Sequence, residues 1–393
     1  MGFRRINDMR YKIQKAFIWA LMSLWGATIY TGCSDVKFHA VPTQACIDHN
    51  ETYGPGTCVT TNGVDHFSYT KTFGDIDILF VIDNSGSMYV EQSLMAARIQ
   101  GFIGFLEEEG FNYNIAMTTT DISETGDSTN ELQDGNFIEF TNAEGVKTGT
   151  SVLTPETGDN VGYRSQIFEN TIKRQETLDC EQSNFAEDSC PSFDERGIYA
   201  ANLVLDRADS SFFRQGAHLA IVFLSDEDER GKGVESTFQS YDSPETLVGK
   251  INTQLGAAKG VSFYSLIIKP GDKECKKEQD EQPNEYVYGE YGVQYARLSD
   301  AKDSELLALG NVIGGYTGNI CADDYKTQLD IMAELIGSYT YIEPLVCDPQ
   351  EINVSVGGEA LTSDSYHVED GNLVIDRNIT PGDVVDLKVD CLI

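Results

Sequence analysis

The sequence has little positive charge. Its 393 residues include 28 Lys and Arg against 63 Asp and Glu, which gives a formal net charge of −35. A chain this acidic repels the phosphates of nucleic acid and the anionic face of a membrane. Electrostatic binding to either is therefore excluded, whereas divalent cations are favoured as partners.

Several catalytic and metal-binding motifs are also missing. No Cys-x-x-Cys pair occurs, which argues against a zinc site or a thioredoxin-like redox centre. No Gly-x-Ser-x-Gly elbow occurs, and of five histidines only His218 lies at the start of an apolar run. A hydrolase is therefore the least favoured functional class, and His218 is interpreted as a structural strand residue.

The first 32 residues differ from the rest of the chain. A basic segment, residues 1–15, precedes an uncharged apolar segment, residues 16–30, and this order is typical of a signal peptide. The sequence Thr-Gly-Cys at residues 31–33 resembles the lipobox of bacterial lipoproteins, although Tyr30 stands where that motif prefers Leu. We expect a lipid on Cys33 and a place at the bacterial outer membrane; the alternatives are an ordinary secretory signal and an uncleaved anchor.

Nine cysteines support the lipid prediction, because an odd number leaves one without a disulfide partner. Setting Cys33 aside leaves an even set, which in an exported chain indicates disulfides. Eight cysteines allow 105 connectivities, so the pairing stays open. Proximity in the sequence favours Cys46–Cys58, Cys180–Cys190, Cys275–Cys321 and Cys347–Cys391.

The main part of the chain alternates between strand and helix patterns. The fold class predicted from this alternation is α/β, with an open, mostly parallel sheet covered by helices on both faces. Strands are expected at 76–82, 111–120, 217–229, 261–269 and 338–345. Helices are expected at 89–110, 160–178, 193–208, 243–260, 303–315 and 323–337.

Four regions follow from these patterns. Residues 1–32 form a signal peptide, 33–70 a lipidated tether rich in Thr, Gly and Pro, and 71–346 the α/β domain. Residues 347–393 show short alternating strands with turns at 357–358, 370–371 and 381–382, which indicates a small all-β module.

Oxygen-bearing side chains follow two of the buried strands. Asp83, Ser85 and Ser87 come directly after the apolar run 78–82, and Asp226 follows a second such run. Ligands of parallel α/β sheets bind at the carboxyl ends of the strands. Carboxylates and hydroxyls are hard donors, so these four residues predict a site for Mg²⁺, with Mn²⁺ or Ca²⁺ as substitutes.

The Asp-x-Ser-x-Ser pattern at 83–87 resembles the metal-ion-dependent adhesion site of von Willebrand factor type A domains. The later acid Asp226 and the segment 306–320 strengthen the resemblance, which covers about residues 75–345. It implies that Ser85 and Ser87 bind the metal directly and that Asp83 and Asp226 act through water. It also implies an open coordination position, which the carboxylate of a partner protein fills.

The sequence departs from this family in two places. The family places a threonine before the helix that begins here near Gly197, but no threonine precedes it. Ser192 or Asp194 is expected to supply that oxygen instead. Glu227 and Asp228 follow Asp226 where the family usually has glycine, and these extra acids favour Ca²⁺ or fill the position of a ligand.

The function expected from these observations is metal-dependent adhesion or protein binding at the bacterial cell envelope, without catalysis. The partner is expected to be a protein that offers an acidic side chain. The alternative is a scaffold or assembly subunit of an envelope complex.

Overall fold

The computed structural model describes residue 46 and residues 57–392, apart from gaps at 62, 124–125, 127, 184–189, 192–194, 208–210, 230–237, 257–258, 281–288, 301–302, 340–341, 346, 370 and 377–378. The expected signal peptide, Cys33, Ser192 and Asp194 lie outside the described residues. Residues 43–393 form one compact unit.

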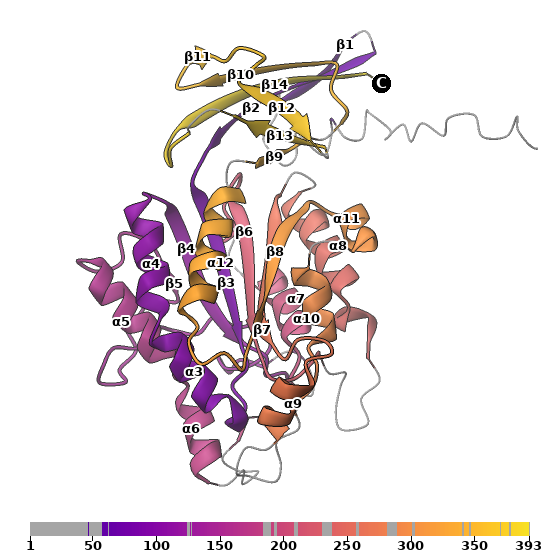
Figure 1. Ribbon diagram of the computed structural model, residues 1–393. Helices are drawn as coiled ribbons and strands as arrows, with labels where there is room; N and C mark the ends of the chain where they lie inside the picture. The colour runs from indigo at the N-terminus through magenta and orange to yellow at the C-terminus, as the bar shows by residue number, and fades with distance from the viewer. Residues whose placement is uncertain are drawn as a thin grey trace, which may run out of the picture. The chain divides into compact units, whose positions relative to one another are not determined.

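The centre of the α/β domain is a six-stranded sheet in the order β5-β4-β3-β6-β7-β8 (Figure 1). Neighbouring strands run parallel except for the short edge strand β5, which is antiparallel to β4. The strands are β3 Asp75–Ile82, β4 Asn112–Thr119, β5 Val152–Leu153, β6 His218–Leu224, β7 Val261–Ile267 and β8 Val312–Asn319. Every residue of β6 and β7 is buried, because helices cover both faces of a parallel sheet.

Two apolar cores, one on each face of the sheet, hold the helices in place. Even-numbered residues of β3, such as Phe80, pack with α3, α4, α5 and α12, and odd-numbered residues, such as Val81, pack with α7, α8, α10 and α11. The helices are α3 Tyr89–Ala96, α4 Ile99–Glu108, α5 Val161–Ile172, α6 Gln175–Gln182, α7 Gly197–Arg207, α8 Pro244–Leu255, α9 Lys273–Asp280, α10 Val293–Ser299, α11 Ser304–Leu309 and α12 Lys326–Tyr339. The predicted α/β fold class is therefore confirmed.

One predicted helix is partly wrong. The segment 303–315 was expected to be helical throughout, but α11 ends at Leu309 and residues 312–319 form the edge strand β8. Two glycines allow this strand to form. A Cβ on Gly314 would lie 2.1 Å from Tyr339 Oη, and a Cβ on Gly315 would lie 2.2 Å from the Phe263 carbonyl oxygen.

A second set of strands forms the β module. Its larger sheet has the order β1-β2-β14-β10-β11, and its smaller sheet has the order β12-β13-β9. The strands are β1 Cys58–Thr61, β2 Val64–Thr72, β9 Ile342–Pro344, β10 Glu351–Val356, β11 Glu359–Ala360, β12 Tyr366–Glu369, β13 Asn372–Ile375 and β14 Val384–Leu392. The expected turn at 357–358 lies between paired strands, and so does Gly371; residue 370 of the expected turn at 370–371 lies outside the described residues.

The β module is larger than its expected range of 347–393. Strand β2 pairs with β14 along its whole length, from Val64↔Leu392 to Thr72↔Val384. Phe67 and Tyr69 of β2 pack in one core with Val385 and Leu387. Residues 58–70 were expected to be tether and residues 71–72 to belong to the α/β domain, because a local pattern does not reveal a strand partner more than 300 residues away.

The four disulfides join Cys46–Cys58, Cys180–Cys190, Cys275–Cys321 and Cys347–Cys391. These are the pairings that proximity in the sequence favoured. Cys347–Cys391 connects the start of the tail to β14, and Cys275–Cys321 connects α9 to the segment after β8.

Candidate metal centre

The candidate site lies where β3 and β6, which are neighbours in the sheet, reach their carboxyl ends. Asp83 directly follows β3, and Asp226 lies two residues beyond β6. Their exposed fractions are 0% and 1%. Two carboxylates thus lie almost out of contact with solvent at one edge of the sheet.

The loop after β3 places its two serines between these acids. Ser85 N–H donates to Asp83 Oδ1 at 2.9 Å, which turns the loop back on the strand end. The Ser85 and Ser87 hydroxyl oxygens lie 2.9 Å apart, and Ser87 Oγ donates to Asp226 Oδ1 at 3.2 Å. The structure therefore brings together all four residues that the sequence predicted on these two strand ends.

Further hydrogen bonds fix the aspartate at the end of β3. Ser225 Oγ donates to Asp83 Oδ2 at 2.7 Å, so both carboxylate oxygens of Asp83 accept bonds from the protein. Gln92 Nε2 donates to the Asp83 carbonyl oxygen at 2.9 Å and to Thr177 Oγ1 at 3.0 Å. These hydrogen bonds fix the geometry of the loop.

The electrostatics of the site are unfavourable without a cation. Burial raises the pKa of Asp226 well above its usual value, and the nearby carboxylates of Asp83, Glu227 and Glu91 raise it further. Burial also raises the pKa of Glu91, although a hydrogen bond from Gln279 Nε2 at 2.9 Å opposes the shift. Because like charges at close range cannot all ionise cheaply, the site favours a positive ion.

Unpartnered oxygens provide a second indication. Most buried polar atoms in proteins have a hydrogen-bond partner. Among the described residues, four buried oxygens near this edge have none: Asn84 Oδ1, Glu91 Oε2, Thr120 Oγ1 and Asp226 Oδ2. All four are hard donors, so the residues present fit Mg²⁺, Mn²⁺ or Ca²⁺.

Asp228 and Glu229 accept hydrogen bonds from backbone N–H groups in the first turns of two helices. Glu229 accepts from Ile198 N at 2.7 Å and from Tyr199 N at 2.9 Å, so it caps α7. Asp228 accepts from Gln294 N at 2.9 Å in α10. Burial raises the pKa of Asp228 to about 6. These contacts account for both carboxylates without a second cation.

Two residues of this edge were not predicted from the sequence. Glu91 is 3% exposed on α3, and Thr120 is 1% exposed directly after β4. Glu91 carried no signal, because an acid in the first turn of a helix is usually a solvated residue. Thr120 did have a sequence signal, because it follows a buried strand that ends at the same edge of the sheet as Asp83.

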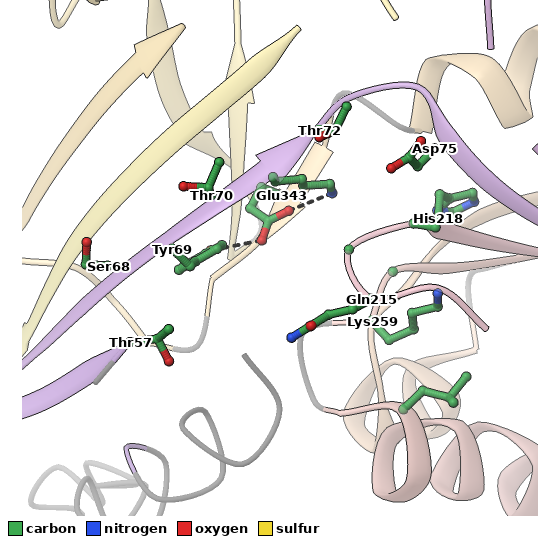
Figure 2. Close-up of a pocket in the computed structure, with 15 residues that line it drawn as sticks. Thr57, Ser68, Tyr69, Thr70, Thr72, Asp75, Gln215, His218, Lys259 and Glu343 are labelled. Carbon is green, nitrogen blue, oxygen red and sulfur yellow. Dashed lines mark hydrogen bonds and ion pairs between the residues drawn. The ribbon is translucent and has the colours of Figure 1, made fainter. Parts of the chain in front are cut away.

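A cleft of about 420 Å³ lies at the opposite, amino ends of β3, β6 and β7 (Figure 2). Its charged groups neutralise one another. Lys71 Nζ donates to Glu343 at 2.6 Å, and Lys259 Nζ donates to Asp77 at 3.1 Å. His218 also lines the cleft, with its Nε2 2.7 Å from Ser262 Oγ. This pattern is typical of a structural ion-pair network.

No protein-family model and no curated protein matches the chain. Solved structures do match. One is a von Willebrand factor type A protein from Catenulispora acidiphila, 12% identical, with a TM-score of 0.32, over 84% of this chain and 60% of that one. A second is the manganese-loaded TRAP protein of Plasmodium vivax, 11% identical, with a TM-score of 0.26, over 58% and 72%.

A third is the ArnB paralog VWA2 from Sulfolobus acidocaldarius, 11% identical, with a TM-score of 0.26, over 86% of this chain and 64% of that one. The chain spans 60% of the length of the first of these proteins. The likeness is one of fold alone. The candidate site rests only on the residues of this chain.

Proposed function

We propose that this chain is a divalent-cation-dependent protein-binding domain of the bacterial cell envelope. One observation carries the proposal. Ser85, Ser87 and Asp226 converge at a buried, acidic edge of the sheet, where Asp226 Oδ2 has no partner among the described residues.

The residues around the loop suggest how the ion would be held. Ser85 and Ser87 offer neutral hydroxyl oxygens, while the carboxylate of Asp83 already accepts from Ser85 N–H and Ser225 Oγ. A bound cation would keep much of its charge and attract a carboxylate oxygen from a partner. The protein's own part is to hold the two hydroxyls and Asp226 in place.

The described residues favour binding over catalysis. A serine nucleophile needs a neighbouring general base. The described histidines bond elsewhere: His66 to Asp390, His218 to Ser262 and His367 to Asp376. We therefore propose no hydrolytic role for Ser85 or Ser87.

Calorimetry with Mg²⁺, Mn²⁺ and Ca²⁺ tests the ion site. We expect one bound ion for the wild type and no binding heat for the double variant Asp83→Ala/Asp226→Ala. The matched control is Asp206→Ala, which removes an acid that pairs with Lys250 far along α7. Equal heats for the wild type and the double variant would contradict the proposal.

The partner would carry an exposed Glu or Asp. We expect chromatography of envelope extracts over the immobilised chain to retain a protein in Mg²⁺ and to release it in EDTA. Immobilised Ser85→Ala/Ser87→Ala should retain nothing. Sensitivity of the domain to external protease on intact cells favours adhesion, and protection favours the alternative, a scaffold of an envelope complex.

The envelope location rests on the disulfides and on Cys33. Disulfides persist in oxidising compartments outside the cytoplasm. No helix among the described residues is long and apolar enough to cross a membrane. We propose a lipid on Cys33 as the anchor. Palmitate labelling should be present in the wild type and absent in Cys33→Ala, and labelling retained in that variant would rule the anchor out.

A further inference from the structure

The family pattern places an oxygen donor in the loop before α7. Ser192 and Asp194 lie outside the described residues, and the next residues along the chain are Glu195 and Arg196. An oxygen donor can also come from another element at the same edge of the sheet. Strand β4 is the other neighbour of β3 and ends at that edge.

Thr120, directly after β4, carries a hydroxyl in an unusual state. Its exposed fraction is 1%, and Oγ1 has no hydrogen-bond partner among the described residues. A buried hydroxyl without a partner costs free energy. The neighbouring Thr119 is different, because its Oγ1 donates to the Leu132 carbonyl oxygen.

The strand register puts Thr120 beside Asp83. Ile82 pairs with Thr119, and Thr120 N–H still donates to the Ile82 carbonyl oxygen at 3.1 Å, so the next pair is Asp83 and Thr120. Successive side chains of a strand alternate between faces, and paired residues share a face. Val81 of β3 and Ala116 of β4 pack on the face covered by α7. The same parity places Asp83 and Thr120 on that face.

The backbone of Thr120 is fixed from both sides. Its carbonyl oxygen accepts from Arg196 N at 2.7 Å, which ties β4 to the residue that precedes α7. Arg196 is 1% exposed, and its Nε donates to Asp242 Oδ1 at 2.8 Å. Its guanidinium lies 4.3 Å from the ring centre of Tyr199 and 4.8 Å from that of Tyr241. The backbone of the residue that bears this hydroxyl is therefore held in place by β3 and by the segment before α7.

We propose that Thr120 Oγ1 supplies a hydroxyl oxygen to the coordination shell of the bound cation, in the role that the family gives to a threonine of the loop before α7. This inference rests on the proposed ion site. A neutral hydroxyl adds a hard donor without adding another negative charge to a site that already gathers Asp83, Glu91 and Asp226.

The variant Thr120→Val tests the inference, because it keeps the shape of the side chain and removes the hydroxyl. We expect the Mg²⁺ dissociation constant to rise about tenfold or more. We expect the thermal midpoint in EDTA to stay the same or to rise, because no hydrogen bond is lost. Thr120→Ser, which keeps the hydroxyl, should bind Mg²⁺ nearly as the wild type does.

Thr119→Val is the matched control. It removes the bond to the Leu132 carbonyl oxygen, so its thermal midpoint in EDTA should fall while its Mg²⁺ dissociation constant stays close to that of the wild type. The inference is overturned if Thr120→Val binds Mg²⁺ as tightly as the wild type. If the wild type itself gives no Mg²⁺ heat, the proposed ion site fails first, and the inference fails with it.

Discussion

The carboxylate of Asp226 lies in a buried place among other acids. Asp83, Glu227 and Glu91 all raise its pKa, after burial itself. In the absence of a cation, each ionised acid at this edge opposes folding. The negative charge of Asp226 therefore favours cation binding but lowers the stability of the fold when no cation is bound.

We expect Asp226→Asn to raise the free energy of unfolding in EDTA at pH 8, because an amide avoids the cost of burying this carboxyl group among other acids. The same variant should lose the stabilisation that Mg²⁺ gives the wild type. Urea unfolding with and without Mg²⁺ measures both effects. Asp206→Asn should instead lower stability by up to about 1 kcal/mol, since it removes a partly exposed ion pair with Lys250. A destabilised Asp226→Asn would contradict the electrostatic account.

His218 makes stability depend on pH. Burial and the charges of Lys71 and Lys259 hold its pKa well below 6.5, so the folded protein keeps the ring neutral while the unfolded chain protonates it. The stability that neutral His218 supports is present above about pH 6.5 and is lost as pH falls below that value.

We therefore expect His218→Gln to lose less stability than the wild type between pH 7.5 and pH 5. Unfolding titrations at several pH values provide the comparison. The exposed His367 is the control, because a hydrogen bond with Asp376 raises its pKa and gives its contribution the opposite sign. Parallel pH profiles for His218→Gln and the wild type would refute this assignment.

At the scale of elements, the edge strand β8 depends on glycine. A Cβ on Gly315 would lie 2.2 Å from the Phe263 carbonyl oxygen and 2.6 Å from the Ser299 carbonyl oxygen. Both atoms belong to the backbone and have little freedom to move. We expect Gly315→Ala to lower the free energy of unfolding by about 1–3 kcal/mol.

Gly249→Ala provides the matched control for this prediction. Gly249 lies in α8, and a Cβ there would contact nothing within 4 Å. This variant should raise the free energy of unfolding by about 0.5–1 kcal/mol, because alanine favours a helix. Denaturant titration measures both changes. Equal effects of the two variants would show that β8 does not require the close approach.

The sequence predicted those elements whose pattern is local. The buried strands β3, β6 and β7 are short apolar runs. The positions of Asp83 and Asp226 after β3 and β6 predicted the candidate site, which stays a proposal. The interpretation of 312–315 as helix was wrong, since apolar residues such as Leu306, Leu309 and Ile313 also fit a helical spacing. The packing of Gly314 against Tyr339 favours a strand over a helix here, and a local sequence pattern does not reveal such a contact.

Glu91 had no sequence signal and Thr120 only a weak one, for a related reason. A threonine after a strand and an acid early in a helix are common at positions without a function. Their importance follows from burial and from the lack of a partner for Thr120 Oγ1 and Glu91 Oε2 among the described residues. Both properties arise only when four separate segments meet at the edge of the sheet.

For the molecule as a whole, strand pairing decides which residues belong to the β module. We propose that the module comprises residues 57–73 together with 342–393. Removal of the tail leaves β2 without β14 and exposes Phe67 and Tyr69, which are 2% and 9% exposed in the full chain.

A chain of residues 43–339, which keeps the Cys46–Cys58 disulfide, is therefore expected to bind a hydrophobic dye and to aggregate. A chain of residues 74–339, which lacks every strand of the module, should remain monomeric and bind Mg²⁺ as the full chain does. Light scattering and calorimetry on the two chains measure this. The proposed boundary is wrong if the longer chain is the better behaved, or if the shorter chain loses the ion.

We propose that the edge formed by β3, β4 and β6 holds a divalent cation. A crystal grown with Mn²⁺ tests it most directly, through the anomalous difference map of the metal. We expect one strong peak bounded by the oxygens of Ser85, Ser87, Asp226 and Thr120. A map with no peak there, or with its only strong peak at another place, would contradict it.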